Sequence, residues 1–132
     1  MSFLIDTDVC SAYLKRPGNL FSRFVQYAGR MHLASVSLAE LYVWAYGRDD
    51  PAPRLRQIAD LTQSIEVVNF DAPAADHFGR LRARLKGHGV NVAAPDLMIA
   101  SIALSRNLTL VTHNTRHFTP IAGLRLDDWL VP

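Results

Sequence analysis

Short apolar segments that alternate with longer helical patterns restrict the fold of this chain more than any other feature. Because helical stretches separate most of these segments, successive strands are joined by crossovers and run parallel. Five segments are expected to be strands, the last of them at an edge of the sheet: 3–5, 32–34, 65–70, 108–112 and 124–130. The pattern predicts an α/β fold, with a three-layer α/β/α arrangement around a mainly parallel sheet.

The stretches between the strands have helical periodicity and end at glycine or proline. Asp71 is placed to cap a long helix whose apolar face is formed by Ala74, Phe78, Leu81 and Leu85. The stretch "DDPAPRLRQIADL" is expected to start a helix with prolines in its first turn, where a helix tolerates them. The expected helices reach to about residue 14 and then cover 20–27, 36–46, a stretch after 51, 74–85 and 95–106.

The length of 132 residues is enough for one hydrophobic core, so we expect residues 1–132 to form a single domain. Every apolar run is shorter than the roughly 18 residues of a membrane helix. The N-terminus also lacks the basic and apolar regions of an export signal. Cys10 is the only cysteine and cannot form an internal disulfide, which favours a reducing compartment. These features predict a cytoplasmic protein that does not associate with membranes.

Carboxylates occur where strands end and helices begin. Asp6 follows the first strand directly, Glu40 lies near the start of the helix after the second strand, and Asp96 follows Pro95 at a helix start. In parallel α/β sheets, ligands bind outside the carboxyl ends of the strands. We therefore expect these three carboxylates to meet in one crevice.

Each acid also has a local explanation. Asp6 is placed to cap the following helix, and Ser37–Glu40, "SLAE", has the pattern of a capping box in which the glutamate reaches back to the cap amide. Asp96 suits the positive end of a helix dipole. Asp8 is interpreted as a cap or as a group that orients its neighbours.

Three carboxylates in one crevice repel one another unless a cation neutralises them. Ligands that are all oxygen select a hard cation, which favours Mg²⁺ or Mn²⁺ over Zn²⁺. His113 and His117 have a spacing that can hold zinc on a helix, but no third ligand stands at a recognisable spacing.

The distribution of charge favours a polyanionic partner. The chain has 14 basic and 12 acidic residues, and once the three acids of the expected site are set aside, 14 basic residues stand against 9 acidic ones, a net charge of +5. Arg82 and Lys86 lie on one side of the helix from Ala74, and Arg116 lies closer to the crevice. We expect these three residues to contact phosphates, although a basic helix face is equally typical of a solvated surface.

Four motifs occur in a recognisable order along the chain: "FLIDTDV", "SLAELYVWA", "APDLMIASIAL" and "LTLVTHNTRHF". Together they resemble the PIN-domain ribonucleases, and most closely the VapC-type toxins of bacterial toxin–antitoxin pairs. The tail "IAGLRLDDWL" is similar to the "PGLRVEDWL" pattern of those toxins. The resemblance covers nearly the whole chain.

The resemblance implies a PIN-like fold and assigns roles to particular residues. Asp6, Glu40 and Asp96 match the three catalytic acids that hold the divalent metal in the family. Thr112 matches a hydroxyl at the floor of the site. Asp8 stands where many members carry asparagine, and is expected to be a supporting polar group.

One position departs from the common family pattern. Many members have a fourth acid after the last core strand, and this chain has Asn114 there, which is expected to act with the catalytic acids. An asparagine can ligate a cation through its carbonyl oxygen or position a water molecule. The loss of a charge argues against a tightly held second cation.

The activity implied by the resemblance is that of an endoribonuclease that requires Mg²⁺, with Mn²⁺ as a substitute. A divalent cation polarises the phosphoryl oxygen and acidifies a coordinated water molecule. No histidine is recognisable as a general base. The implied partners are RNA, a small cognate antitoxin whose tail covers the groove, and a second copy of the chain, in a homodimer or a larger toxin–antitoxin complex.

Two other functions compete with this one. A catalytically inactive PIN-fold module that binds nucleic acid or protein is favoured by Asn114. A phosphotransferase of the haloacid-dehalogenase type would use Asp6 as its nucleophile. That class needs a lysine between its threonine and its late acid pair, whereas the last lysine here is Lys86. It also leaves Glu40 and Asp96 without a function.

Overall fold

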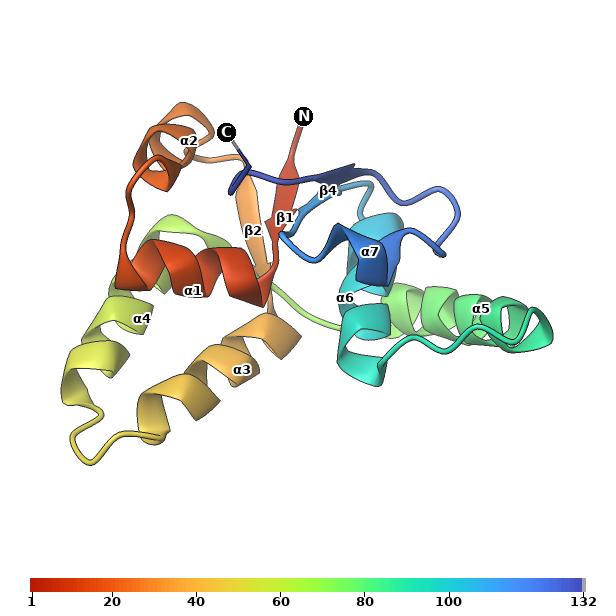
Figure 1. The fold of residues 1–132 in the computed structure, drawn as a ribbon, viewed down its shortest axis with the longest axis horizontal. Helices are drawn as coiled ribbons and strands as arrows, with labels where there is room; N and C mark the ends of the chain where they lie inside the picture. The colour runs from red at the N-terminus through yellow and green to blue at the C-terminus, as the bar shows by residue number, and fades with distance from the viewer. Residues whose placement is uncertain (132) are drawn as a thin grey trace.

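The computed structural model describes residues 1–131, so the last residue of the predicted domain lies outside it. A sheet of five parallel strands forms the centre (Figure 1), in the order β3-β2-β1-β4-β5. The chain therefore starts in the middle of the sheet, builds one edge and then crosses to the other. The strands are β1 (Phe3–Ile5), β2 (Met31–Ala34), β3 (Glu66–Val68), β4 (Thr109–Val111) and β5 (Leu126–Asp127).

Helices cover both faces of the sheet and complete three layers. In Figure 1, α1, α3 and α4 lie on one side of the strands, and α5, α6 and α7 on the other. Within residues 1–131, no helix is long and apolar enough to cross a membrane. The helices are α1 (Thr7–Lys15), α2 (Leu20–Gln26), α3 (Ser35–Tyr46), α4 (Ala52–Ser64), α5 (Ala72–Gly87), α6 (Ala94–Ser105) and α7 (Thr115–Phe118).

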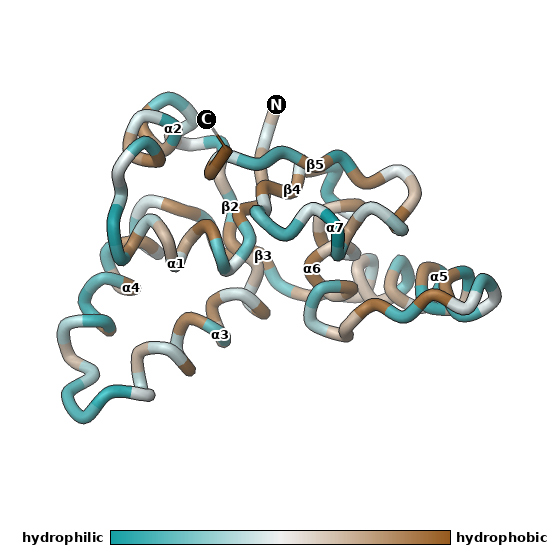
Figure 2. Tube along the Cα trace, viewed as in Figure 1, coloured by the Kyte–Doolittle hydropathy of each residue, from teal (hydrophilic) through white to brown (hydrophobic). Residues whose placement is uncertain are grey.

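Successive residues of the central strand β1 fill two separate cores, because side chains alternate across a sheet. Phe3 and Ile5 belong to the core under α1 to α4, and Leu4 belongs to the core under α5, α6 and α7. Figure 2 shows the apolar residues concentrated on the central strands and α6, while α4 and α5 alternate between apolar and polar residues. A sheet buried on both faces is what holds its strand ends in a rigid position.

The predicted fold class is confirmed, and the five expected strands are present with β5 at an edge. Asp71 caps α5 as predicted, with its carboxylate accepting a hydrogen bond from the amide of Ala74. The sequence did not predict α7. Its four residues are too few to display a helical period, and Phe118 is the one that anchors it in the core.

The alternative interpretation of Ser37–Glu40 as a capping box is wrong. Helix α3 begins at Ser35, so Ser37 lies inside the first turn instead of preceding it. The Ser37 side chain is fully buried, and its hydroxyl has no hydrogen-bond partner within residues 1–131. Leu41 and Ala45, one and two turns further, are buried on the same face, so Ser37 belongs to the buried face of the helix.

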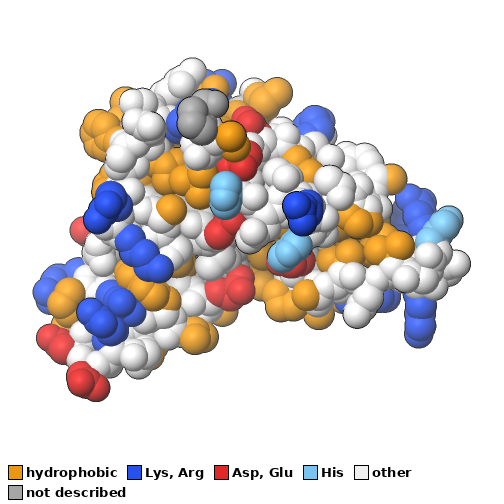
Figure 3. All heavy atoms as spheres, in the orientation of Figure 1, with side chains coloured by type: hydrophobic (Ala, Val, Ile, Leu, Met, Phe, Trp, Pro, Cys, Tyr) orange, Lys and Arg blue, Asp and Glu red, His pale blue; other side chains and the backbone are white. Residues whose placement is uncertain are grey.

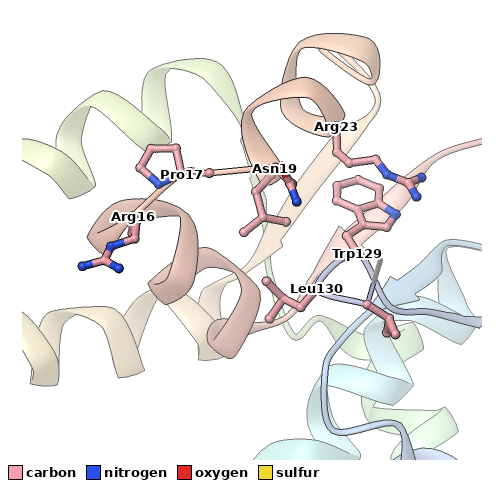
Figure 4. A pocket seen from close by; sticks show the side chains of 9 residues that line it. Arg16, Pro17, Asn19, Arg23, Trp129 and Leu130 are labelled. Atoms are coloured by element: carbon pink, nitrogen blue, oxygen red, sulfur yellow. The ribbon is translucent and has the colours of Figure 1, made fainter.

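The C-terminal segment packs against α2 and the central strand β1. Trp129 is buried and stacks on Tyr27 with a ring separation of 5.4 Å. The guanidinium of Arg23 lies 5.8 Å from the Trp129 ring, and Figure 4 shows the two side chains next to each other. A pocket of about 370 Å³ opens here between the α1–α2 connection and the C-terminal segment, and Asp6, Glu40 and Asp96 do not line it.

Candidate active site

Acidic side chains and histidines gather at the carboxyl edge of the sheet. Figure 3 shows them in the middle of one face of the molecule, between α1 and α3 on one side and α6 and α7 on the other. The parallel strands bring together the first turns of α1 and α3, which follow β1 and β2. Helix α6 precedes β4 and runs back toward its start, so its own first turn lies at the same edge. Three helix N-termini therefore surround one place.

Asp6 is the most enclosed of these acids, with 6% of its surface exposed. It caps α1, and its Oδ1 accepts a hydrogen bond of 2.8 Å from the backbone amide of Thr7. Its Oδ2 accepts a second bond of 2.8 Å from the hydroxyl of Thr112, at the end of β4. The interpretation of Asp6 as a helix cap explains the hydrogen bond to Oδ1. It does not explain the bond from Thr112 to Oδ2, which links Asp6 to the end of β4.

The surroundings of Asp6 oppose its ionisation. Burial raises the pKa of Asp6 to about 6, and the negative charge of Asp8 acts in the same direction. The charge of Asp96 makes a smaller contribution in the same direction. The carboxylate is thus buried among like charges, an arrangement that a bound cation relieves.

Asp8 ties the loop after β4 to the start of α1. Its Oδ2 accepts hydrogen bonds from the amide nitrogen of the Asn114 side chain at 3.2 Å and from the backbone of His113 at 3.1 Å. Burial also raises the pKa of Asp8. The backbone amide of Asn114 donates to the hydroxyl of Thr112. Asp8 therefore fixes the position of Asn114 relative to the start of α1.

Glu40 approaches the site from α3 and is exposed. Its Oε1 accepts a hydrogen bond of 2.7 Å from the hydroxyl of Thr7. This contact takes the place of the return to a cap amide that the capping-box pattern predicted. Glu40 is thereby connected to Asp6 through one intervening residue.

Asp96 lies in the first turn of α6, and a histidine stands beside it. The Nδ1 of His117 is 3.4 Å from a carboxylate oxygen of Asp96. The other histidine, His113, instead contacts Asp128 at 3.0 Å and precedes α7 rather than lying on it. The two histidines therefore pair with different acids, and their sequence spacing does not form a zinc site.

The donor set fits a hard divalent cation. Within residues 1–131, no three histidine, cysteine, aspartate or glutamate side chains are close enough together to hold a metal ion on their own. The three carboxylates expected to meet do not form such a group: Glu40 bonds to Thr7, and the charge of Asp96 acts on Asp6 without a direct contact between them. Mg²⁺ is bound by one or two carboxylates together with water and substrate phosphates, so it does not need a complete protein cage.

The three basic residues that are expected to contact phosphates differ in how far contacts within the fold constrain their side chains. The guanidinium of Arg82 donates to the carbonyl of Val92 at 2.8 Å and lies 5.4 Å from the ring of Phe78, so it also supports the fold. Arg82 and Lys86 line a pocket of about 570 Å³ along the loop that leads into α6. Arg116 is exposed on α7, directly beside the acids' edge of the sheet.

Two features of the site were not expected from the sequence. The hydroxyl of Thr7 bonds to Glu40, and its only sequence signal is its position directly after Asp6. The pairing of His113 with Asp128 joins the ends of β4 and β5. The only sequence feature that could have indicated this pairing is the acid pair in "LDDWL", which the strand pattern assigns to an edge strand.

Comparisons with known proteins identify the family to which the chain belongs. The PIN domain family matches residues 3–124. The tRNA(fMet)-specific endonuclease VapC of Shigella flexneri is 39% identical over 98% of this chain and 98% of its own. Ribonuclease VapC2 of Haemophilus influenzae strain Rd is 32% identical over 98% of this chain and 99% of its own.

A solved structure shares the fold along the same length. One chain of the DNA-bound VapBC crystal structure from Salmonella typhimurium superposes with a TM-score of 0.93 at 36% identity, and the match covers 98% of both chains. The family match spans the strands and helices that carry Asp6, Glu40, Asp96 and Asn114. The chain therefore belongs to the PIN-domain family, among its VapC-type members.

Proposed function

We propose that this chain is an endoribonuclease that requires a divalent metal and acts as the toxin of a toxin–antitoxin pair. The observation that carries the proposal is the buried Asp6, which is held on both oxygens and lies in the field of two further carboxylates. Relatives named as VapC ribonucleases, similar over nearly their whole length, support the same activity.

Asp6 and Asp96 would hold the cation, with Glu40 as the third acid, and Mg²⁺ is the expected ion with Mn²⁺ as a substitute. When bound, the cation supplies charge neutralisation at the phosphate and acidifies a water molecule. The protein's part is to keep its oxygens fixed. Thr112 and the backbone of Thr7 orient Asp6, which leaves further lone pairs on each oxygen available.

Other residues would bind and orient the RNA. Asn114, held by Asp8, stands beside the acids with a polar side chain that can position water or a phosphate oxygen. Arg116 and Lys86 offer positive charge on either side of α6, and Arg82 lies along the same pocket as Lys86. These contacts address the sugar–phosphate backbone and do not define which RNA sequence is cut.

A toxin of this kind needs a protein that restrains it. The Salmonella typhimurium relative was solved as a VapBC assembly, which supports a cognate antitoxin as a partner of this chain. A homodimer, or a larger complex with the antitoxin, belongs to the same proposal. So does a cytoplasmic location, where the RNA substrate is present.

The test is to incubate the purified protein with total RNA and Mg²⁺ and to map the new 5′ ends. We expect discrete cleavage sites that disappear with EDTA. Asp6→Asn and Asp96→Asn should lower the rate by about 10²-fold or more, because each removes a charged oxygen ligand. Asp76→Asn, which removes an exposed acid paired with Arg80 on α5, is the matched control and should cut normally.

Two outcomes would contradict the proposal. Cleavage by Asp6→Asn at the wild-type rate would remove Asp6 from the site. Binding of RNA with no cleavage under Mg²⁺ or Mn²⁺ would favour a catalytically inactive module that has the same fold.

A further inference from the structure

A single residue connects two of the acids through its own hydrogen bonds. The backbone amide of Thr7 donates to Oδ1 of Asp6 at 2.8 Å, while its hydroxyl donates to Oε1 of Glu40 at 2.7 Å. Asp6 lies on the loop after β1, and Glu40 lies on α3 beyond β2. Thr7 thus joins the start of α1 to α3 through a contact between residues that are 33 positions apart in the chain.

The two acids depend on Thr7 to different degrees. Asp6 is buried and also receives a hydrogen bond from Thr112, so it keeps its orientation without the Thr7 side chain. Glu40 is exposed, and within residues 1–131 the Thr7 hydroxyl supplies the one side-chain hydrogen bond to its carboxylate. A glutamate has several rotatable bonds, so an untethered Glu40 would sample many rotamers in solvent.

We propose that Thr7 is a positioning residue that holds Glu40 beside Asp6, ready to share the divalent cation. This inference rests on the metal-dependent function proposed above. Partners that hydrogen-bond to ligating carboxylates fix their orientation, and their loss typically weakens metal affinity 10- to 100-fold. The Thr7 hydroxyl has that relation to Glu40, because it occupies one lone pair of Oε1 and leaves Oε2 free to reach the cation.

The chemistry of the side chain allows a clean test. Thr7→Val keeps the β-branched shape at the first position of α1 and keeps the backbone bond to Asp6, but it removes the hydroxyl. Thr7→Ser keeps the hydroxyl and loses only a methyl group. A role that is merely structural would depend on shape, and a positioning role depends on the hydroxyl.

The experiment measures Mn²⁺ affinity by electron paramagnetic resonance, without RNA, for the wild type and each variant. We expect Thr7→Val to bind Mn²⁺ about tenfold more weakly and Thr7→Ser to bind within about twofold of the wild type. With RNA present, the Mg²⁺ concentration for half-maximal cleavage should rise for Thr7→Val, while the rate at saturating Mg²⁺ changes little. Thermal melts in EDTA verify that each variant is folded.

A double-mutant cycle with Glu40→Ala assigns the effect to Glu40. If Thr7 acts through Glu40, adding Thr7→Val to Glu40→Ala should weaken Mn²⁺ binding no further. Full additivity of the two substitutions would overturn the inference, as would wild-type Mn²⁺ affinity in Thr7→Val. In either case a wild-type protein that still cuts RNA with Mg²⁺ leaves the proposed function intact. A wild type that neither binds Mn²⁺ nor cuts RNA refutes both.

Discussion

Asp6 is the side chain where stability and the proposed activity conflict most directly. Its folded pKa of about 6 lies above the ordinary value of 3.8, so the folded protein binds a proton more tightly than the unfolded chain does. The stability that comes from protonated Asp6 is complete below about pH 3.8 and is lost as the pH rises through about 6. At neutral pH the ionised Asp6 therefore destabilises the metal-free fold.

Because ionised Asp6 destabilises the metal-free fold, Asp6→Asn should stabilise the protein in the absence of metal. At pH 8 in EDTA we expect the variant to be more stable than the wild type by up to about 3 kcal/mol, because the amide removes the buried charge and keeps hydrogen-bonding atoms in place. The difference should shrink as the pH falls toward 4. Urea or thermal unfolding at several pH values measures it. A wild type that is the more stable protein at pH 8 would contradict the sign.

Helix α3 shows how a local motif misleads when the helix begins elsewhere. The pattern "SLAE" fits a capping box, but the helix begins two residues earlier, at Ser35, and Ser37 lies on the buried face that it shares with Leu41 and Ala45. Its hydroxyl is buried and has no partner in the described part of the chain. Glu40 is thereby released from capping and lies free to reach Thr7.

The two interpretations of Ser37 predict opposite effects of Ser37→Ala. A capping serine replaced by alanine costs about 1 kcal/mol. A buried hydroxyl without a partner carries an unfavourable desolvation energy, so its removal should be neutral or stabilise the fold by about 1 kcal/mol. We expect the second result in urea unfolding. A decrease of about 1 kcal/mol in the free energy of unfolding of Ser37→Ala would instead support a capping role for Ser37. Ser35→Ala, at the first helical residue, is the comparison variant.

The whole molecule presents its positive charge around an acidic centre, and this arrangement predicts how it binds RNA. Lys86→Ala and Arg116→Ala should each weaken RNA binding and lower the slope of log affinity against log salt by about 0.7, as one lost phosphate contact does. Binding is measured by fluorescence anisotropy in the Asp6→Asn background, which prevents cleavage. The matched control, Arg56→Ala on α4, should leave both quantities unchanged.

Arg82 should behave differently from the other two basic residues. Its guanidinium bonds to Val92 and packs on Phe78, so Arg82→Ala should lower thermal stability as well as RNA affinity. An unchanged melting temperature for Arg82→Ala would show that these contacts contribute little. A salt slope unchanged in all three variants would place the RNA on another face.

The sequence was sufficient for the fold class and for the edge of the sheet at which the site lies. Hydrophobic periodicity depends only on residues that are close in the sequence. Segments such as 3–5 and 108–112 can therefore be predicted as buried strands without knowledge of their tertiary contacts. Parallel strands place their carboxyl ends at one edge, so Asp6 and the first turn of α3 were expected there from topology alone. Asp96 was expected at the same edge from its position at a helix start, and the resemblance of four motifs to the PIN domain family added Asn114.

Hydrogen-bond partners were beyond the reach of the sequence, because each depends on where distant backbone segments come to rest. Thr112 and Asp6 are 106 residues apart, and their 2.8 Å contact exists only once β1 and β4 lie side by side. The same holds for Thr7 with Glu40 and for His113 with Asp128. Local patterns therefore predicted which residues lie at the carboxyl edge of the sheet. Long-range packing determined which hydrogen-bond partner each of them has.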